Sequence, residues 1–393
     1  MFRKTELIAF FFTSLFSLFI FSGCNSTKNT ASNFCEENKN KDEFISIVFG
    51  GDIMAHRPNY AMKDYSLIWE DIKDFLHEGD LALANLEAPV DDKKTFETYP
   101  TFNMNSSYVQ AAIDAGFNVF SLANNHTNDQ KLEGILETYK YFIQKEEETK
   151  YSERPVHACG IKNISKAPLT YRLINIKNWK ILFCAVTEIL NKPYYSSYID
   201  FFSPGPKGRT LLKEKIKLLK EKNPCDIFIL SLHASDEEYI QSIREEQKNF
   251  YNELLEYGVD IVWANHAHVA KDWELLEYQN TDTSKMIFHA LGNTISAQRY
   301  KPNFKNPSEN REYTGDGYLI KVLFKKTQNG IKVEQITPLL ITTYITPEYN
   351  FVVKKLNDET INKFRDEENI KWASFLTERK KLMENTKGNI RCQ

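Results

Sequence analysis

Side chains that commonly bind metal ions stand just past the ends of apolar runs along this chain. They comprise two carboxylates, four imidazoles and one carboxamide: Asp52, Glu87, His56, His233, His266, His268 and Asn125. Mixed oxygen and nitrogen ligands suit borderline divalent ions, so the sequence predicts a site for one or two ions of Mn, Fe or Zn. Two such ions about 3.5–4 Å apart can activate water and neutralise charge on a transferring phosphoryl group.

Each of these features has an ordinary structural explanation when it is taken alone. An aspartate after a strand, such as Asp52, is most often a turn or helix-cap residue, and a single histidine is usually structural. The pair His266 and His268 is more informative, because alternating side chains place both imidazoles on one side of an extended strand. Five of the eight histidines follow strand-like runs, and this combined pattern favours a metal site.

Strand-like runs alternate with amphipathic patterns, which predicts a layered α/β fold around a largely buried sheet. The strands that precede the polar residues are expected at 44–50, 81–86, 117–122, 226–232, 260–264 and 285–291. In open α/β sheets, ligands bind outside the carboxyl ends of the strands. If these strands share one sheet or two stacked sheets, the polar side chains should converge.

Helical spacing of apolar residues predicts the segments that connect these strands. Helices are expected at 66–76, 108–116, 130–146, 209–222 and 236–257, a hairpin at 169–176 and 179–187, and later strands at 317–325 and 331–344. The last residues, 352–393, are highly charged and have weak helical periodicity. We expect them to form either a C-terminal helix packed on the surface or a partly loose tail.

Six motifs occur in the order seen in the CapA family, which is linked to poly-γ-glutamate capsule synthesis. They are G-D-I-M-A-H (51–56), A-N-L-E-A-P-V (84–90), S-L-A-N-N-H-T-N-D (121–129), L-H-A-S-D-E (232–237), A-N-H-A-H-V (264–269) and H-A-L-G-N (289–293). The chain resembles this family over about 44–300. The family is similar in fold to calcineurin-type metallophosphoesterases, so the resemblance implies a metallophosphoesterase-like α/β sandwich with a sheet core flanked by helices.

The phosphoesterase resemblance also implies roles for the strand-end residues. Asp52 and His268 would serve one metal ion, Glu87 would bridge, and the second ion would be served by Asn125, His233 and His266. His126 would stabilise or protonate the leaving oxygen, and Asp129 would either orient His126 or cap the helix that begins near residue 130. The residues expected to contact substrate are Asn85, Asn124, Glu237 and Asn293.

Two departures from the phosphoesterase pattern bear on how tightly the site can bind metal ions. Met54 stands where those enzymes carry a second metal-binding histidine, and a thioether is a poor ligand for hard ions. The first metal position is therefore incomplete unless His56 reaches it. Ser235 replaces a glycine that is usual in the family. The site is expected to hold one ion tightly and a second weakly, or one ion only.

The composition and the motifs leave three functions open. The formal net charge is −3, so no basic excess argues for nucleic acid as a partner. The first function is synthesis, export or trimming of an anionic surface polymer such as poly-γ-glutamate, by a metal-dependent hydrolase. The second is a metal-dependent phosphatase or phosphodiesterase of the cell envelope. The third is a non-catalytic scaffold that braces a membrane synthase complex.

The N-terminal residues resemble a bacterial lipoprotein signal. Arg3 and Lys4 precede an apolar run at 8–21, which is too short for a comfortable membrane span and suits a signal-peptide core. F-S-G-C at 21–24 then offers Cys24 for lipidation, with a plain secretory signal or an uncleaved anchor as alternatives. The expected organisation is a signal peptide (1–23), a polar linker (24–42), a CapA-type domain (43–350) and a charged helical extension (351–393), anchored to a membrane and facing the periplasm or exterior.

Overall fold

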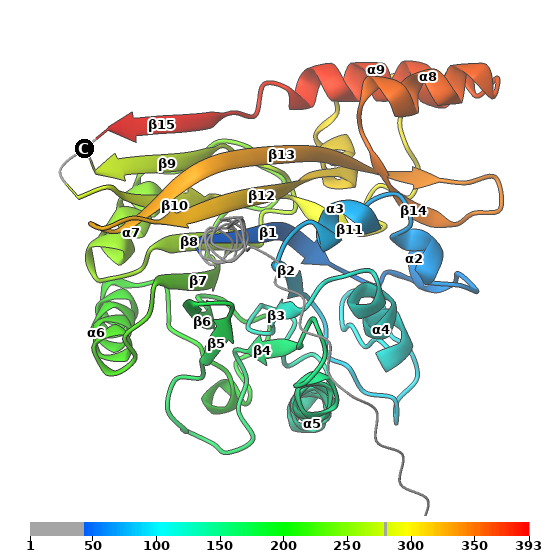
Figure 1. Cartoon of the computed structure of the whole chain (residues 1–393). Coiled ribbons are helices and arrows are strands. Elements are labelled where there is room, and N and C mark those ends of the chain that lie inside the picture. The colour runs from blue at the N-terminus through cyan, green and yellow to red at the C-terminus, as the bar shows by residue number, and fades with distance from the viewer. Residues whose placement is uncertain (1–42, 279–280, 393) are drawn as a thin grey trace, which may run out of the picture. The chain divides into compact units, whose positions relative to one another are not determined.

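The computed structural model describes residues 43–278 and 281–392 of the chain (Figure 1). These described residues fall within one compact unit. The predicted signal peptide, Cys24 and the polar linker lie outside the described residues. Within the described part of the chain, no helix has the length and apolar character needed to cross a membrane.

The first sheet contains eight strands and carries the N-terminal half of the candidate site. Seven strands follow the order β14-β13-β12-β1-β2-β3-β4, and β11 pairs with β1 in parallel. Strands β1 to β4 are parallel, whereas β12, β13 and β14 are antiparallel to their neighbours. The bounds are β1 Phe44–Ile53, β2 Leu81–Leu86, β3 Val119–Ser121, β4 His157–Cys159, β11 Asn293–Ile295, β12 Asp316–Lys326, β13 Ile331–Ile345 and β14 Phe351–Lys355.

The second sheet has seven strands in the order β15-β9-β10-β8-β7-β6-β5. Strands β6, β7, β8 and β10 are parallel, and β5 forms the predicted antiparallel hairpin with β6. The bounds are β5 Arg172–Ile176, β6 Trp179–Thr187, β7 Ile227–His233, β8 Ile261–Asn265, β9 Trp273–Tyr278, β10 Thr283–Phe288 and β15 Gly388–Cys392.

The two sheets pack face to face through one apolar core. The Phe49 ring of β1 lies 4.7 Å from the Phe288 ring of β10, and Trp263 Nε1 of β8 donates a hydrogen bond to the Gly50 carbonyl at 2.9 Å. Strands β2, β7 and β8 are buried along their whole length, which explains their nearly continuous apolar sequences. Each large side chain buried here contributes about 1.5–3 kcal/mol.

Helices cover the outer faces of both sheets. Phe142 of α5 packs on Phe120 of β3 at 5.3 Å, while α6 and α7 bury Leu212 and Leu254 against the second sheet. The predicted α/β class, with sheets flanked by helices, is therefore confirmed. The helices are α2 Arg57–Tyr60, α3 Lys73–His77, α4 Ser106–Asp114, α5 Lys131–Thr149, α6 Pro206–Lys222 and α7 Glu245–Glu256, with short 3-10 turns η1 Ser66–Ile68, η2 Ser196–Tyr198 and η3 Asn310–Gly315.

Two predicted helices are wrong in extent. The segment expected as one helix at 66–76 forms η1 and α3, although all of its apolar side chains except the partly buried Leu67 are buried, as the pattern required. The helix expected at 236–257 begins only at Glu245. The preceding residues form a loop because Tyr239 adopts a left-handed φ of 66° and donates its backbone N–H to the Ala267 carbonyl at 2.8 Å. That loop lies against the candidate site.

The charged C-terminal segment, expected to be a surface helix or a partly loose tail, contains two helices and also two strands that the sequence pattern did not predict. Helices α8 (Asp358–Asp366) and α9 (Ile370–Met383) follow β14, and β15 then pairs in parallel with β9. Figure 1 shows this segment in orange and red along one side of the molecule. The Asn357 side chain accepts a hydrogen bond from the Thr360 N–H and caps α8. Residues 351–392 therefore join both sheets.

Candidate metal centre

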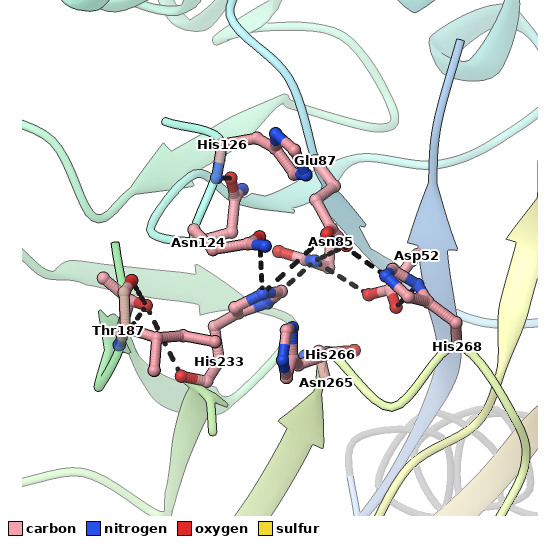
Figure 2. A network of polar contacts seen from close by, with 12 residues as sticks. Asp52, Asn85, Glu87, Asn124, His126, Thr187, His233, Asn265, His266 and His268 are labelled. Carbon is pink, nitrogen blue, oxygen red and sulfur yellow. Dashed lines mark hydrogen bonds and ion pairs between the residues drawn. The ribbon is translucent and has the colours of Figure 1, made fainter. Parts of the chain in front are cut away.

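Side chains from both sheets converge at the carboxyl ends of β1, β2, β7 and β8. Asp52 lies near the end of β1, Glu87 follows β2, His233 ends β7, and His266 and His268 follow β8. Strand register explains the convergence, since Asp52 stands opposite Asn85 and His233 opposite Asn265 in parallel pairs. Figure 2 shows these side chains pointing toward one another. All five are at most 6% exposed.

Three overlapping groups of these side chains could hold a metal ion. In each group the ligand atoms lie within 4.8 Å of one another. The groups are Asp52 with Glu87 and His268, Glu87 with His233 and His266, and Glu238 with His266 and His268. Glu87 belongs to the first two groups, which is the position that a bridging carboxylate would occupy.

The unpaired polar atoms in this cluster fit a cation. Glu87 Oε1 is buried without a hydrogen bond and lies 3.9 Å from His233 Nε2 and 3.6 Å from His268 Nε2. Burial raises the pKa of Glu87 well above its ordinary value. Burial also lowers the pKa of His233, and it lowers that of His266 to about 3. Neutral imidazoles keep a lone pair for a metal, and a cation would stabilise the ionised carboxylate.

His268 differs from the other two histidines because it stands between two carboxylates. Burial opposes its charge, but Glu87 and Asp52 raise the pKa of His268 to about 10. Its Nδ1 lies 3.2 Å from Asp52 Oδ2 and 3.1 Å from Asn293 Oδ1, so Nε2 faces Glu87. A metal ion must displace a proton from a ligand of this kind, and binding would therefore release protons.

Asn85 and Asn293, predicted to contact substrate, lie behind the candidate ligands. Asn85 Nδ2 donates to Asp52 Oδ1 at 2.8 Å and lies 3.4 Å from both Glu87 Oε2 and His233 Nδ1. Asn293 approaches His268 and also donates to the Thr314 carbonyl at 2.8 Å. Both amides are buried, so their interactions orient ligands.

His126 and Asp129 form a close pair beside the cluster. His126 Nδ1 lies 2.6 Å from Asp129 Oδ2, which also accepts the Phe102 N–H at 2.7 Å. Helix α5 begins at Lys131 with Gln130 as its N-cap and no capping side chain. Of the two alternatives for Asp129, the geometry therefore supports orientation of His126. With Nδ1–H donated to Asp129, the Nε2 atom remains for proton transfer.

The two asparagines that precede His126 make different contacts. Asn124 Oδ1 accepts the His126 N–H at 3.1 Å and Asn124 Nδ2 donates to the Leu86 carbonyl at 2.8 Å, so this amide shapes the loop. Its contact with substrate stays a prediction. Asn125 Oδ1 lies 3.0 Å from His233 Nε2, within the predicted second metal position. The structure thus brings Asn125 to the ligand with which it was predicted to act.

His56 and Glu237 are not among the grouped ligands of the described residues. His56 Nδ1 accepts the Ala297 N–H at 3.3 Å, and burial lowers the pKa of His56 to about 3. It does not complete the position that Met54 leaves open. Glu237 is exposed, whereas Oε1 of its neighbour Glu238 lies 3.7 Å from His266 Nε2.

Sequence reasoning missed Glu238 and Asn191. The sequence offered two adjacent glutamates, and only the fold of the loop distinguishes them. Asn191 Nδ2 lies 3.2 Å from His126 Nδ1, but no motif surrounds this residue. The extended-strand argument for the histidine pair was also wrong, because β8 ends at Asn265 and His266 and His268 adopt φ values of 105° and 57°. Such strained backbone is common at functional sites.

Comparisons with known proteins agree with the resemblance in the motifs. A family model described as bacterial capsule synthesis protein PGA_cap matches residues 46–298. The chain is 24% identical over 315 residues to Capsule biosynthesis protein CapA of Bacillus anthracis, covering 77% of this chain and 68% of that protein. It is 24% identical over 307 residues to PGA biosynthesis protein CapA of Bacillus subtilis (strain 168), covering 76% and 72%.

Two solved structures are more distant. A hypothetical protein from Thermus thermophilus aligns over 75% of this chain and 98% of its own, with 14% identity and a TM-score of 0.42. Calcineurin-like phosphoesterase YfkN from Bacillus subtilis aligns over 85% and 99%, with 12% identity and a TM-score of 0.41. The assignment rests on the family model, which spans more than half of the 393 residues. The chain belongs to the PGA_cap family of bacterial capsule synthesis proteins.

Proposed function

We propose that this protein is a metal-dependent hydrolase that processes an anionic capsular polymer at the cell envelope, with poly-γ-glutamate as its substrate. One observation carries the proposal: the buried carboxylate of Glu87 keeps an oxygen, Oε1, without a hydrogen bond within reach of three imidazoles, and a paired histidine and aspartate lie beside it. The names of the two Bacillus relatives support a capsular polymer as the substrate class.

The candidate ligands would divide between two positions. One position would use Asp52 and His268, the other His233, His266 and Asn125, and Glu87 would contact both. When bound, divalent ions would supply Lewis-acid chemistry and neutralise developing negative charge.

The protein's own acid is His126. Asp129 would accept its Nδ1 proton, and the Asn191 amide lies beside the ring, with Nδ2 3.2 Å from Nδ1 and 3.4 Å from Nε2. In its doubly protonated form, the His126 ring would then donate the Nε2 proton to the leaving group of the scissile bond and keep the Nδ1 proton on Asp129. The buried ligand set would orient the reacting group and exclude bulk water from it.

Envelope attachment is part of the same proposal. Lipidation at Cys24 would tether the domain, and the polar residues after it would act as a flexible spacer. The protein would then face the periplasm or the exterior, where capsular polymer is assembled, and it would be available to a membrane synthase complex.

A metal-dependent phosphatase or phosphodiesterase of the envelope is the second candidate, because the same ligand types serve phosphoryl transfer. A scaffold without catalysis is the third, and the buried thioether of Met54 favours it.

Elemental analysis of the full chain, purified in detergent, tests the proposal first. We expect about one or two Mn, Fe or Zn ions per chain, and their loss in an Asn125→Ala/His233→Ala double variant. Release of glutamate oligomers from poly-γ-glutamate, compared with turnover of a model phosphodiester, then separates the first two candidates. Absence of metal after reconstitution would refute both hydrolases and favour the scaffold.

A further inference from the structure

A groove leads away from the candidate centre, and the proposed chemistry does not use it. Two cavities, of about 380 Å³ and 530 Å³, share Tyr239, Gln298 and Arg311 in their lining. The first cavity also contacts His56, which places one end of the groove beside the centre. The second is also lined by Ile240, an exposed side chain.

The floor of the groove is bonded to residues of the centre. Gln298 Oε1 accepts a hydrogen bond from Asn293 Nδ2 at 2.8 Å, and Gln298 Nε2 donates to the Tyr239 hydroxyl at 3.3 Å. The Tyr239 ring stacks near the His268 ring, with 6.0 Å between centroids. A chain lying in this groove would therefore continue directly from a bond held at the centre.

Arg311 supplies a cation to the groove without an internal counter-ion. Its Nε donates to the Gln298 carbonyl at 2.8 Å, and its guanidinium lies 5.3 Å from the centre of the Tyr300 ring. Among the described acidic groups, none lies within 4.0 Å of this guanidinium. These contacts hold the side chain in place while leaving its two terminal nitrogens free to bind a carboxylate in a bidentate manner.

Aromatic side chains form the exposed walls. Tyr99 is 71% exposed and Tyr239 is 39% exposed, although both line the first cavity. Tyrosines offer a large contact area and a hydroxyl at low cost in conformational entropy. The acidic residue of the groove, Glu238, is directed toward His266, with 3.7 Å between Oε1 and Nε2. The groove thus combines amphipathic walls with one unpaired positive charge.

We propose that this groove binds the part of a carboxylate-bearing polymer that flanks the reacting bond, with Arg311 pairing to a polymer carboxylate. The proposal rests on the proposed function, and it adds the recognition element that would select a polyanionic chain over a small phosphoester.

Calorimetric titration of the full chain with a poly-γ-glutamate oligomer tests this site. Arg311→Gln should weaken binding by about 10- to 100-fold, the cost of a charge-assisted pair. Lys301→Gln is the matched control, because Lys301 lies over the same Tyr300 ring at 5.2 Å but lines neither cavity. It should change binding less than about twofold. Metal content should be unchanged in both variants.

The outcomes separate this proposal from the proposed function. If the two variants bind the oligomer equally and keep their metal and turnover, the proposal that the groove binds polymer through Arg311 is wrong. The proposed hydrolase function would be unaffected. Failure of the native chain to bind metal would instead refute the hydrolase. Polyphosphate of matched length provides a further arm: tighter Arg311-dependent binding of polyphosphate than of polyglutamate would overturn the assignment to a carboxylate polymer.

Discussion

Two buried polar clusters in this protein balance their charges in opposite ways. In the first, Asp316 of β12 bonds to Arg299 Nη1 at 2.8 Å, to Arg379 Nε at 2.6 Å and to Thr342 Oγ1 at 2.6 Å. Burial works against the charge of Asp316, but the two guanidinium groups lower its pKa. The carboxylate is therefore ionised and fully paired by the protein itself, and the cluster ties α9 to the first sheet.

The second cluster is the candidate metal centre, where the nearest imidazole nitrogens stand 3.6–3.9 Å from Glu87 Oε1. Burial raises the pKa of this carboxyl, and the imidazole of His268, itself a candidate ligand, offsets this only in part. The comparison teaches that buried charge alone does not mark a functional site. A cluster whose carboxylate is paired with guanidinium groups stabilises the fold, whereas a cluster whose carboxylate keeps an unbonded oxygen among imidazoles can receive a cation.

The largest expected effect concerns the cluster around Asp316. Asp316→Asn leaves two buried guanidinium groups without a full counter-charge, and the free energy of unfolding should fall by about 3–5 kcal/mol. Denaturant unfolding in chelator measures this loss. Metal affinity of the folded fraction should match that of the native chain. A loss below about 1 kcal/mol would contradict the structural role assigned to this cluster.

Glu87→Gln should give the opposite result. Metal affinity should fall more than about 100-fold, since a direct ligand exceeds the 10- to 100-fold cost of a residue that only supports one. Stability in chelator should stay the same or rise, because a buried carboxyl with an unbonded oxygen is removed and Asp52 remains beside His268. Titration with Mn²⁺ or Zn²⁺ and unfolding with and without metal measure both quantities. Strong destabilisation with unchanged metal affinity would show that Glu87 belongs with Asp316 as a structural group.

The third prediction separates the acid from the ligands within the centre. Asp129→Asn should keep metal content and lower turnover of poly-γ-glutamate by about 10²- to 10⁴-fold, because His126 loses its orienting carboxylate. Glu133→Gln is a suitable control, since Glu133 lies near the start of α5 with a side chain that is 79% exposed. Loss of metal in Asp129→Asn, or equal turnover in the two variants, would argue against the proposed acid.

The sequence predicted the site better than the loops that complete it. The strand ends carrying Asp52, Glu87 and His233 were found because buried strands have continuous apolar sequences that end in polar residues. The role of Asp129 depended on whether it met His126 or the helix terminus, which only tertiary packing decides. Residues 351–392 showed charge without a clear period, so β14 and β15, which are stabilised by neighbours distant in sequence, gave no local signal.

The smallest expected effect tests whether Glu238 compensates for the metal-binding histidine that Met54 replaces. Glu238 reaches His266 from a loop held at Tyr239, and its side chain is 38% exposed. A partly solvated ligand gains less than a buried one, so Glu238→Gln should weaken metal binding by only about three- to tenfold. Glu237→Gln makes the same chemical change one residue away on an exposed side chain and should leave affinity unchanged. Equal effects of the two variants would mean that the loop attracts the metal ion only through its overall negative charge, without a direct ligand. A selective effect of Glu238 would show that a site lacking one histidine recruits a carboxylate from outside its strand ends.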